Sequence, residues 1–321
     1  MSRIGVGLCL PQLGEHVTVD AVRDFCRRAE DLGYSSLWVQ DHFLWPLEPK
    51  RGYAGRAGAP IPKQYQCVLS PTELLTAAAI WTTTMRLGTS ILVAGNHWPV
   101  SLAQRLSTID LLSDGRLVVG LGVGWNEEEH EASGTDITTR GARMDDFVQA
   151  LLACWGPDPV HHDGPFFYIP PSLVRPKPVQ RPGGRASTEA QRRSTAPELR
   201  PLLLSGMWSA AGLERTRLHF DAWNPAGLSV SAASAIVERL NGDRPDGKAP
   251  LQVFHRSFAQ FPHAPMPSGD VVARLATEAV EAADAGFTEF IIEHNFWDGI
   301  ASPQDWITVP EQFRAVVEAV Y

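Results

Sequence analysis

The sequence predicts an α/β fold, a (β/α)8 TIM barrel with an insertion region. Strand-like and helix-like segments alternate almost to the end of the chain and make up about eight strand–helix units. The 321 residues are enough for one large barrel with a substantial core. An open doubly wound sheet is the alternative. Such a sheet usually has about six strands and a glycine fingerprint after the first strand, where this chain has Pro11 and Gln12.

The first half of the chain contains four predicted strand–helix units. Its strands are short and apolar on both faces, as strands of parallel sheets are. Its helices carry apolar residues at helical spacing; the second and third begin with proline, and Gly33 ends the first. We predict strands at residues 4–10, 35–39, 85–92 and 116–121, and helices at residues 18–32, 71–83, 99–112 and 141–154.

The second half continues the alternation after an interruption at residues 156–200. Within it, residues 161–170 are typical of a hairpin, and residues 181–200 are poor in apolar residues and typical of a mobile loop. The other long loop covers about residues 43–69. We predict later strands at residues 201–204, 221–223, 251–258 and 290–293, and later helices at residues 210–219, 230–240, 271–285 and 310–320. We interpret residues 1–321 as one domain.

The composition is that of a globular protein with an acidic balance. Hydrophobic residues make up 44% of the chain, charged residues make up 20%, and the net charge is -8. The negative charge argues against a nucleic-acid or anionic-membrane partner, and no apolar run approaches a membrane span. The four cysteines lack metal-binding or redox spacing, and the first residues enter a strand without a signal-peptide pattern. We therefore expect free thiols and a cytoplasmic location.

The fourth predicted strand ends in an unusual pattern of alternating glycines. Gly120, Gly122 and Gly124 follow the apolar part of the strand, and Trp125 and Asn126 come directly after them. Repeated glycine in a strand indicates either the close approach of a ligand or relief of crowding between strands. The spacing leaves both interpretations open. Trp125 and Asn126 could offer a ligand a flat apolar surface and an amide.

Polar residues follow other predicted strands, at the end of a barrel where functional groups gather. Asp41 and His42 come after the second strand, and the histidine could exchange protons near neutral pH or simply cap the barrel rim. His97, after the third strand, is a second acid–base candidate or part of ordinary helix capping. Ser205, Gly206 and Met207 join a strand to a helix start that suits a phosphate, or form a serine-capped turn.

Histidines and acids elsewhere give only weak support for a metal site. Glu127, Glu128 and Glu129 precede His130, and we interpret this run as a solvated helix start, since acids favour helix N-termini. The adjacent histidines at 161 and 162 are expected on a loop surface. The sequence contains no His-Glu-x-x-His spacing, so we predict no metal.

Seven motifs in their order along the chain resemble one family, the bacterial-luciferase-like oxidoreductases, and within it the branch that uses the deazaflavin coenzyme F420. The resemblance covers nearly the whole chain. The motifs are GLCLPQ at 7–12, GYSSLWVQDHF at 33–43, LGTSI at 87–91, DLLSDGR at 110–116, GLGVGWNEEE at 120–129, RGARMD at 140–145 and PKPVQ at 176–180.

The resemblance implies a barrel that binds a flavin-type ring at its C-terminal mouth. His42 matches a proposed acid–base residue, and Ser90 and Ile91 match a non-prolyl cis peptide that backs the ring. The other cofactor-binding positions implied are Asp41 at the ring, Gly122, Gly124, Trp125 and Asn126 along the glycine strand, and Ser205, Gly206 and Met207 at a phosphate.

The chain departs from the family pattern at three places. Relatives often carry two glycines where this chain has Ser205 and Gly206. Some relatives place a catalytic glutamate where this chain has Trp125 and Asn126, so no proton donor is transferred from that position. The insertion at 181–200 is unusual.

The resulting hypothesis is an F420-dependent oxidoreductase that transfers hydride between the deazaflavin and a small organic substrate. Trp45, Trp98 and His97 are assigned to the substrate pocket. An FMN-dependent monooxygenase that uses reduced flavin and oxygen is the alternative on the same scaffold. A flavin or deazaflavin carrier is the non-enzyme alternative, and a metal-dependent hydrolase is a distant one. Relatives are often dimers, so we expect a homodimer.

Overall fold

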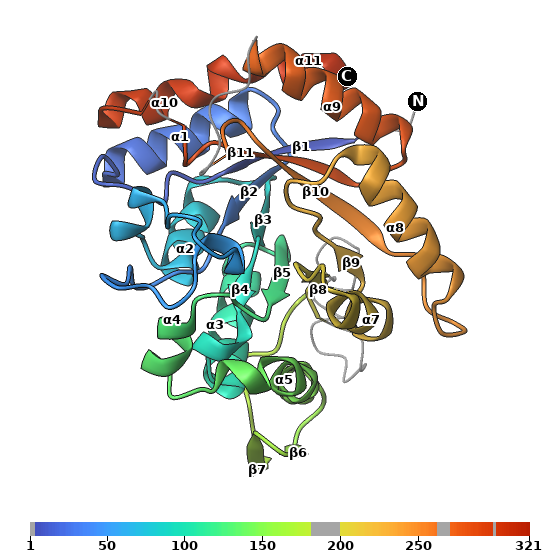
Figure 1. The fold of residues 1–321 in the computed structure, drawn as a ribbon. Coiled ribbons are helices and arrows are strands. Elements are labelled where there is room, and N and C mark those ends of the chain that lie inside the picture. Colours follow the sequence, from blue (N-terminus) through green and yellow to red (C-terminus); the bar gives the residue numbers. More distant parts are fainter. Residues whose placement is uncertain (1–3, 181–199, 262–269, 298–299) are drawn as a thin grey trace.

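Eight parallel strands close into a barrel in the computed structural model, which describes residues 4–180, 200–261, 270–297 and 300–321. The strand order is β3-β2-β1-β11-β10-β9-β8-β5, and a pairing of β3 with β5 closes the ring (Figure 1). The short strand β4 continues β3 and pairs with β5. The barrel strands are β1 (Gly5–Cys9), β2 (Ser36–Val39), β3 (Arg86–Thr89), β4 (Leu92–Val93), β5 (Leu117–Gly122), β8 (Leu202–Ser205), β9 (Ala222–Trp223), β10 (Gln252–Phe258) and β11 (Glu289–Glu293). The predicted TIM barrel is therefore confirmed.

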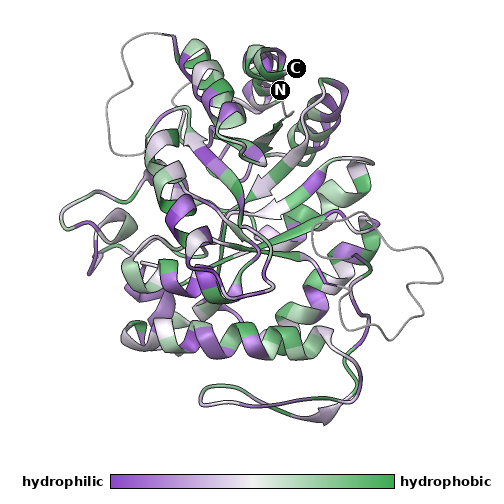
Figure 2. Cartoon of the chain, turned by 90° about the vertical axis from the view of Figure 1, so that its right-hand side faces the viewer, coloured by the Kyte–Doolittle hydropathy of each residue, from purple (hydrophilic) through white to green (hydrophobic). Residues whose placement is uncertain are grey.

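Helices surround the barrel and cover the outward faces of the strands (Figure 1). In Figure 2 these helices carry both hydrophilic and hydrophobic residues, as expected of helices with one face on a core. The helices are α1 (Val19–Asp31), α2 (Pro71–Trp81), α3 (Pro99–Leu112), α4 (Glu127–Ala132), α5 (Arg140–Trp155), α7 (Ala210–His219), α8 (Val230–Gly242), α9 (Val271–Asp284), α10 (Pro303–Gln312) and α11 (Arg314–Val320). Within the described ranges, no helix combines the length and apolar character needed to cross a membrane.

A tryptophan fills the interior of the barrel, and glycines make room for it. Trp38 is fully buried, its indole N–H donates to Ser36 Oγ at 2.6 Å, and its ring meets Phe254 edge-on. A Cβ at Gly7 would lie 2.7 Å from the indole nitrogen, and a Cβ at Gly88 would overlap the indole ring. Glycine on the inward face of these strands thus serves packing, because the interior is already full at this level.

Two predicted elements differ from the structure. The strand predicted at 85–92 is divided into β3 and β4, because the chain bulges at Ser90 and Ile91. The closing helix predicted at 310–320 is wrong: two helices, α10 and α11, end the chain. A capping box between Ser302 and Asp305 starts α10 earlier, and Pro310 lies inside that helix.

The insertion region contains the predicted hairpin. Strands β6 (Val160–Asp163) and β7 (Tyr168–Ser172) pair antiparallel, apart from the barrel sheet. The predicted mobile loop at 181–200 lies, except for its last residue, outside the described residues. The long loop at 43–69 contains two short 3-10 helices, η1 (Tyr53–Gly55) and η2 (Lys63–Gln66). The bridge between Leu13 and Val68 ties the end of this loop to the chain after β1.

Candidate functional site

The ends of β2 and β4 are joined through Asp41. Its carboxylate oxygen Oδ2 accepts a hydrogen bond from the backbone N–H of Val93 at 2.9 Å and lies 2.8 Å from Nε2 of His97. The aspartate is buried, and among the described residues its other oxygen takes part in no hydrogen bond. His97, assigned from the sequence to the substrate pocket, is therefore placed as the partner of Asp41.

The peptide between Ser90 and Ile91 is cis, as the sequence resemblance implied. Three glycines surround the Ile91 side chain. A Cβ at Gly122 or Gly206 would lie 2.5 Å from an Ile91 carbon, and one at Gly120 would lie 3.3 Å away. A real Cβ essentially never approaches this closely at the first two positions, so glycine is required there by packing against Ile91. Gly124 instead adopts a positive φ of 74°.

His42 is held at the rim of the barrel by a carboxylate from α4. Its Nδ1 lies 3.0 and 3.2 Å from the two carboxylate oxygens of Glu129. The same carboxylate accepts the backbone N–H of Phe43 at 3.0 Å. The His42 side chain is 10% exposed and that of Glu129 is 2% exposed. Among the described residues no hydrogen bond engages His42 Nε2, so this nitrogen is available for chemistry.

The glutamates of α4 were interpreted from the sequence as a solvated helix start, and the structure corrects this interpretation, because they bind His42 and the chain that follows it. Glu129 is buried on His42. Its neighbours contact the chain that follows His42: Glu127 pairs with Arg51 at 2.8 Å, Glu128 accepts the backbone N–H of Lys50 at 2.6 Å, and Glu131 pairs with the Lys50 ammonium. Periodicity could not reveal these contacts, because the partners are about 80 residues apart.

Aromatic side chains from the long loop and from the later strands gather beside His42. The His42 ring lies 4.4 Å from the ring of Tyr65 and 5.5 Å from that of Trp125. Tyr53, Phe258 and further rings continue the cluster. We call the whole set the mouth aromatic cluster, consisting of Trp45, Tyr53, Tyr65, Trp125, Phe258, Phe261 and Phe296. Trp45, assigned from the sequence to the substrate pocket, and Trp125, expected to offer a ligand a flat apolar surface, are both members.

Trp98, the third aromatic residue predicted there, is placed elsewhere. It is 57% exposed at the start of α3, and its ring packs edge-on against Phe167 beside the hairpin. Asn126 caps α4, its side-chain oxygen accepting the N–H groups of Glu128 and Glu129. Both residues therefore contact protein groups other than His42.

An ion pair inside the barrel was not found from the sequence. Arg256 on β10 pairs with Glu293 at the end of β11, and its guanidinium also donates to the carbonyl oxygen of Ser90. Burial works against ionisation of both groups, yet their attraction prevails: Arg256 holds the pKa of Glu293 below its usual range, and Glu293 raises the pKa of Arg256. Asn295 adds two N–H donors to Glu293. An arginine within a predicted barrel strand was the available signal, because arginine is rarely buried without a partner.

In the turn predicted to bind a phosphate, the nearest polar groups already form hydrogen bonds within the protein. The Ser205 hydroxyl lies 2.6 Å from Thr216 Oγ1 and also accepts the N–H of Met207, and the Gly206 N–H donates to Leu121 at 2.9 Å. The first N–H groups of α7 lack acceptors within the helix, as at every helix start. The residues there, Trp208 to Ala211, are exposed. Any anion would therefore meet those amides rather than Ser205 and Gly206.

The remaining histidine candidates have protein partners. His130 is buried, with Nδ1 2.9 Å from Thr135 Oγ1 and Nε2 3.0 Å from the carbonyl oxygen of Val123. His162 lies 2.7 Å from the carboxylate of Asp146. In the part of the chain that the structure describes, no three histidine, cysteine, aspartate or glutamate side chains come together as metal ligands do.

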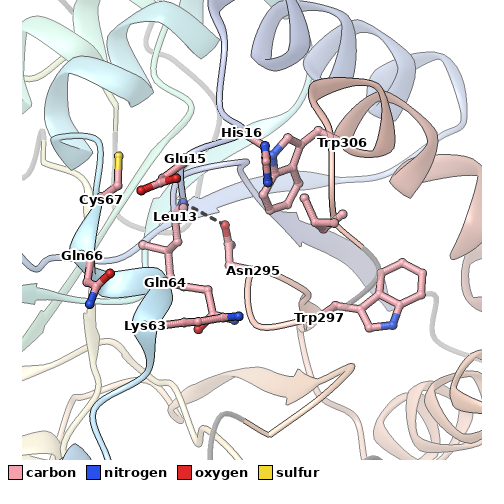
Figure 3. A pocket seen from close by; sticks show the side chains of 12 residues that line it. Leu13, Glu15, His16, Lys63, Gln64, Gln66, Cys67, Asn295, Trp297 and Trp306 are labelled. Carbon is pink, nitrogen blue, oxygen red and sulfur yellow. Dashed lines mark hydrogen bonds between the residues drawn. The ribbon is translucent and has the colours of Figure 1, made fainter.

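A cavity of about 310 Å³ lies on the other side of η2 from His42. Figure 3 shows Leu13, Lys63 and Gln64 around it, with Trp297 and Trp306 across from them and the hydrogen bond from Leu13 to Asn295 at its edge. Tyr65, from the same short helix, contacts His42 instead. The short helix therefore separates this cavity from the His42 site.

Comparison with known proteins gives relatives that use either of two cofactors. An uncharacterised protein of Mycobacterium tuberculosis (strain ATCC 25618 / H37Rv) is 33% identical over 155 residues, 48% of this chain and 55% of that protein. An F420-dependent glucose-6-phosphate dehydrogenase of Amycolatopsis mediterranei is 29% identical over 184 residues, 56% of this chain and 50% of that protein. The oxygenase component of a flavin-dependent trigonelline monooxygenase of Acinetobacter baylyi is 26% identical over 167 residues, which are 51% of this chain and 41% of that protein. The chain thus spans about half the length of the curated relatives it matches.

Solved structures share the fold. An F420-dependent secondary alcohol dehydrogenase in complex with an F420–acetone adduct gives a TM-score of 0.70 at 15% identity, with 100% of both chains covered. EDTA monooxygenase from Chelativorans sp. BNC1 gives 0.66 at 12% identity, covering 99% of this chain and 94% of the other. At these identities the likeness shows the fold alone.

One family profile covers most of the barrel. The profile described as luciferase-like monooxygenase matches residues 7–254, which run from β1 into β10 and include Asp41, His42, the Ser90–Ile91 bulge and the glycine strand. The chain belongs to the luciferase-like monooxygenase family.

Proposed function

We propose that this chain is an F420-dependent oxidoreductase that transfers hydride between the deazaflavin and a small organic substrate. The observation that carries the proposal is the arrangement at the ends of β2, β3 and β5. There, Ile91 is locked by glycines, Asp41 keeps one carboxylate oxygen without a hydrogen bond to described residues, and His42 keeps Nε2 without one. A fixed apolar surface beside polar groups is what a planar ring with one polar edge requires.

The described residues fit such a ring. Both side-chain amide atoms of Asn96, just after β4, are buried without a hydrogen-bond partner among the described residues. The indole N–H of Trp45, in the mouth aromatic cluster, is also buried without a hydrogen-bond partner among the described residues. Buried polar groups normally find partners, and orphaned ones call for a ligand or a water. Asp41, Ile91 and Asn96 would hold the ring, and the exposed amides at the start of α7 would hold a phosphate.

The bound deazaflavin would supply the hydride chemistry. His42 would hold or move the substrate proton at Nε2, since Nδ1 is committed to Glu129. The mouth aromatic cluster would exclude water from the reacting groups and offer the substrate apolar walls. The proposal includes a homodimer and a small-molecule substrate, with no nucleic-acid or membrane partner.

An FMN-dependent monooxygenase is the second candidate. The flavin-dependent trigonelline monooxygenase component supports it among the relatives, as the F420-dependent glucose-6-phosphate dehydrogenases support the first candidate. The same apolar surface at Ile91 would accept either ring, because both are planar tricyclic systems. Affinity for the two cofactors therefore separates the candidates.

The test is a pair of binding titrations of the purified protein with F420 and with FMN. We expect F420 to bind at least about tenfold more tightly. The variant Asp41→Asn should weaken F420 binding about tenfold, because the carboxylate charge is lost at the ring. Asp146→Asn is the matched control, since Asp146 is an equally buried aspartate that pairs with a histidine (His162) on a different element. FMN binding without F420 binding would favour the second candidate, and bound cofactor without any hydride exchange would favour a carrier.

A further inference from the structure

We propose that Glu129 is the positioning residue of His42, and that it fixes which ring nitrogen carries the proton. The inference rests on the proposed function for its consequence in turnover, but its geometry stands without it. Nothing in the spacing of the sequence connects these two residues, because one follows β2 and the other lies on α4, 87 positions later.

The carboxylate of Glu129 sits between two donors on adjacent residues. Oε1 lies 3.0 Å from His42 Nδ1 and 3.0 Å from the backbone nitrogen of Phe43, while Oε2 lies 3.2 Å from Nδ1. A carboxylate can only accept hydrogen bonds. Nδ1 must therefore carry the hydrogen, and in the neutral imidazole Nε2 is then the bare nitrogen.

The Glu129 side chain is held in this position by its own helix. It is 2% exposed, and the cap formed by Asn126 fixes the first turn of α4 by accepting the N–H groups of Glu128 and Glu129. A buried carboxylate needs donors, and the hydrogen bonds from the His42 ring and the Phe43 backbone supply them. The pairing therefore orders both partners.

The rest of α4 fastens the chain that follows His42. Glu127 and Glu131 pair with Arg51 and Lys50, and Glu128 accepts the Lys50 N–H. These neighbours offer matched controls, because they bind the same segment with the same chemical group but do not contact His42. Each of these exposed pairs contributes little to stability by itself.

The decisive variant is Glu129→Gln. The amide oxygen of glutamine satisfies the Phe43 N–H from the position of Oε1, which is also 3.0 Å from His42 Nδ1, and the amide NH2 then occupies the position of Oε2, 3.2 Å from the same nitrogen. The two acceptors that face Nδ1 thus become one acceptor and one donor, so the strict preference for a proton on Nδ1 is lost and the Nε2–H form gains population. The comparable exchange in a serine-protease triad leaves the geometry intact and reduces turnover about 10⁴-fold through the wrong tautomer.

The first measurement is the tautomer of His42 in the protein without added cofactor. Nitrogen-15 NMR at alkaline pH distinguishes the two ring nitrogens, and His42→Asn identifies the signals by their loss. We expect the Nδ1–H form in the native chain and in Glu131→Gln, and a substantial Nε2–H population in Glu129→Gln. Glu129→Leu, which offers no hydrogen bond, should give a mixture of the two forms.

The second measurement is turnover. Glu129→Gln should lose about 10²-fold or more, whereas Glu131→Gln should stay within about twofold of the native chain. An Nδ1–H tautomer that survives in both Glu129 variants would overturn the proposal, whatever the cofactor is. A tautomer that switches while no hydride transfer is found would instead contradict the proposed function and leave the positioning role of Glu129 standing.

Discussion

Two acid–base pairs near the barrel mouth differ in what they leave free. At the rim, Glu129 binds one nitrogen of His42, and the other nitrogen takes no hydrogen bond among the described residues. Inside the barrel, Glu293 accepts from Arg256 and from two N–H groups of Asn295, and the guanidinium also donates to Ser90. The first pair is 10% and 2% exposed, and the second is 9% and 0% exposed.

The difference suits His42 to proton transfer and the Arg256–Glu293 pair to structural support. A histidine with one nitrogen held and the other free can accept or donate a proton at the free nitrogen. An arginine stays charged, and a carboxylate whose oxygens are occupied has little left to offer a ligand. The Arg256–Glu293 pair contacts the Ser90–Ile91 bulge through the Ser90 carbonyl oxygen, whereas the His42–Glu129 pair is the one that would face a substrate under the proposed function.

The largest expected effect comes from His42→Ala. Turnover should fall by about 10²–10⁴-fold, the usual contribution of a general acid or base, while cofactor affinity stays near the native value. Steady-state rates and a binding titration measure the two quantities. His161→Ala is the control, because that histidine lies on the hairpin and contacts the carbonyl oxygen of Ile169. Native turnover in His42→Ala would remove His42 from the mechanism.

The next effect is on stability and comes from Arg256→Met. This variant leaves the Glu293 carboxylate buried without its counter-charge, which should lower the free energy of unfolding by about 3–5 kcal/mol. Urea unfolding measures the loss. The double variant Arg256→Met, Glu293→Gln should recover part of it, because a neutral glutamine can still accept from Asn295. The single variant Glu293→Gln completes the comparison. If the losses in the free energy of unfolding of the two single variants add up to the loss of the double variant, the two residues are not coupled and the supporting role of the ion pair is wrong.

The smallest effect is a pH dependence of stability at His294, the residue that follows Glu293. Burial lowers the pKa of His294, which directly follows β11 and packs against Phe25 and Trp306, to about 4. The folded state therefore resists protonation, so the contribution of His294 is fully present above the ordinary histidine pKa of about 6.5 and is lost as the pH falls toward 4. His294→Leu should reduce the acid destabilisation by roughly 1–3 kcal/mol, measured by urea unfolding at several pH values.

Most of the architecture follows from periodicity, and the exceptions are local. The helix predicted at 210–219 matches α7, and the proline-started helix at 99–112 matches α3. The division of the strand at Ser90 and the early start of α10 at its capping box were not predicted, because both depend on local geometry rather than on apolar spacing. The structure places Asp41, His42 and Ile91, all expected at strand ends, just after the neighbouring strands β2 and β3 of the closed barrel.

The sequence by itself determined the barrel, the family resemblance and the strand ends at which polar groups gather, because these depend on spacing along the chain. Only the tertiary structure decided which groups meet. It showed that Gly122 and Gly206 are glycines because Ile91 occupies the space of a side chain, and that Glu129 is the partner of His42. Such pairings join residues many positions apart, and their distances are set by barrel closure, which no local pattern encodes.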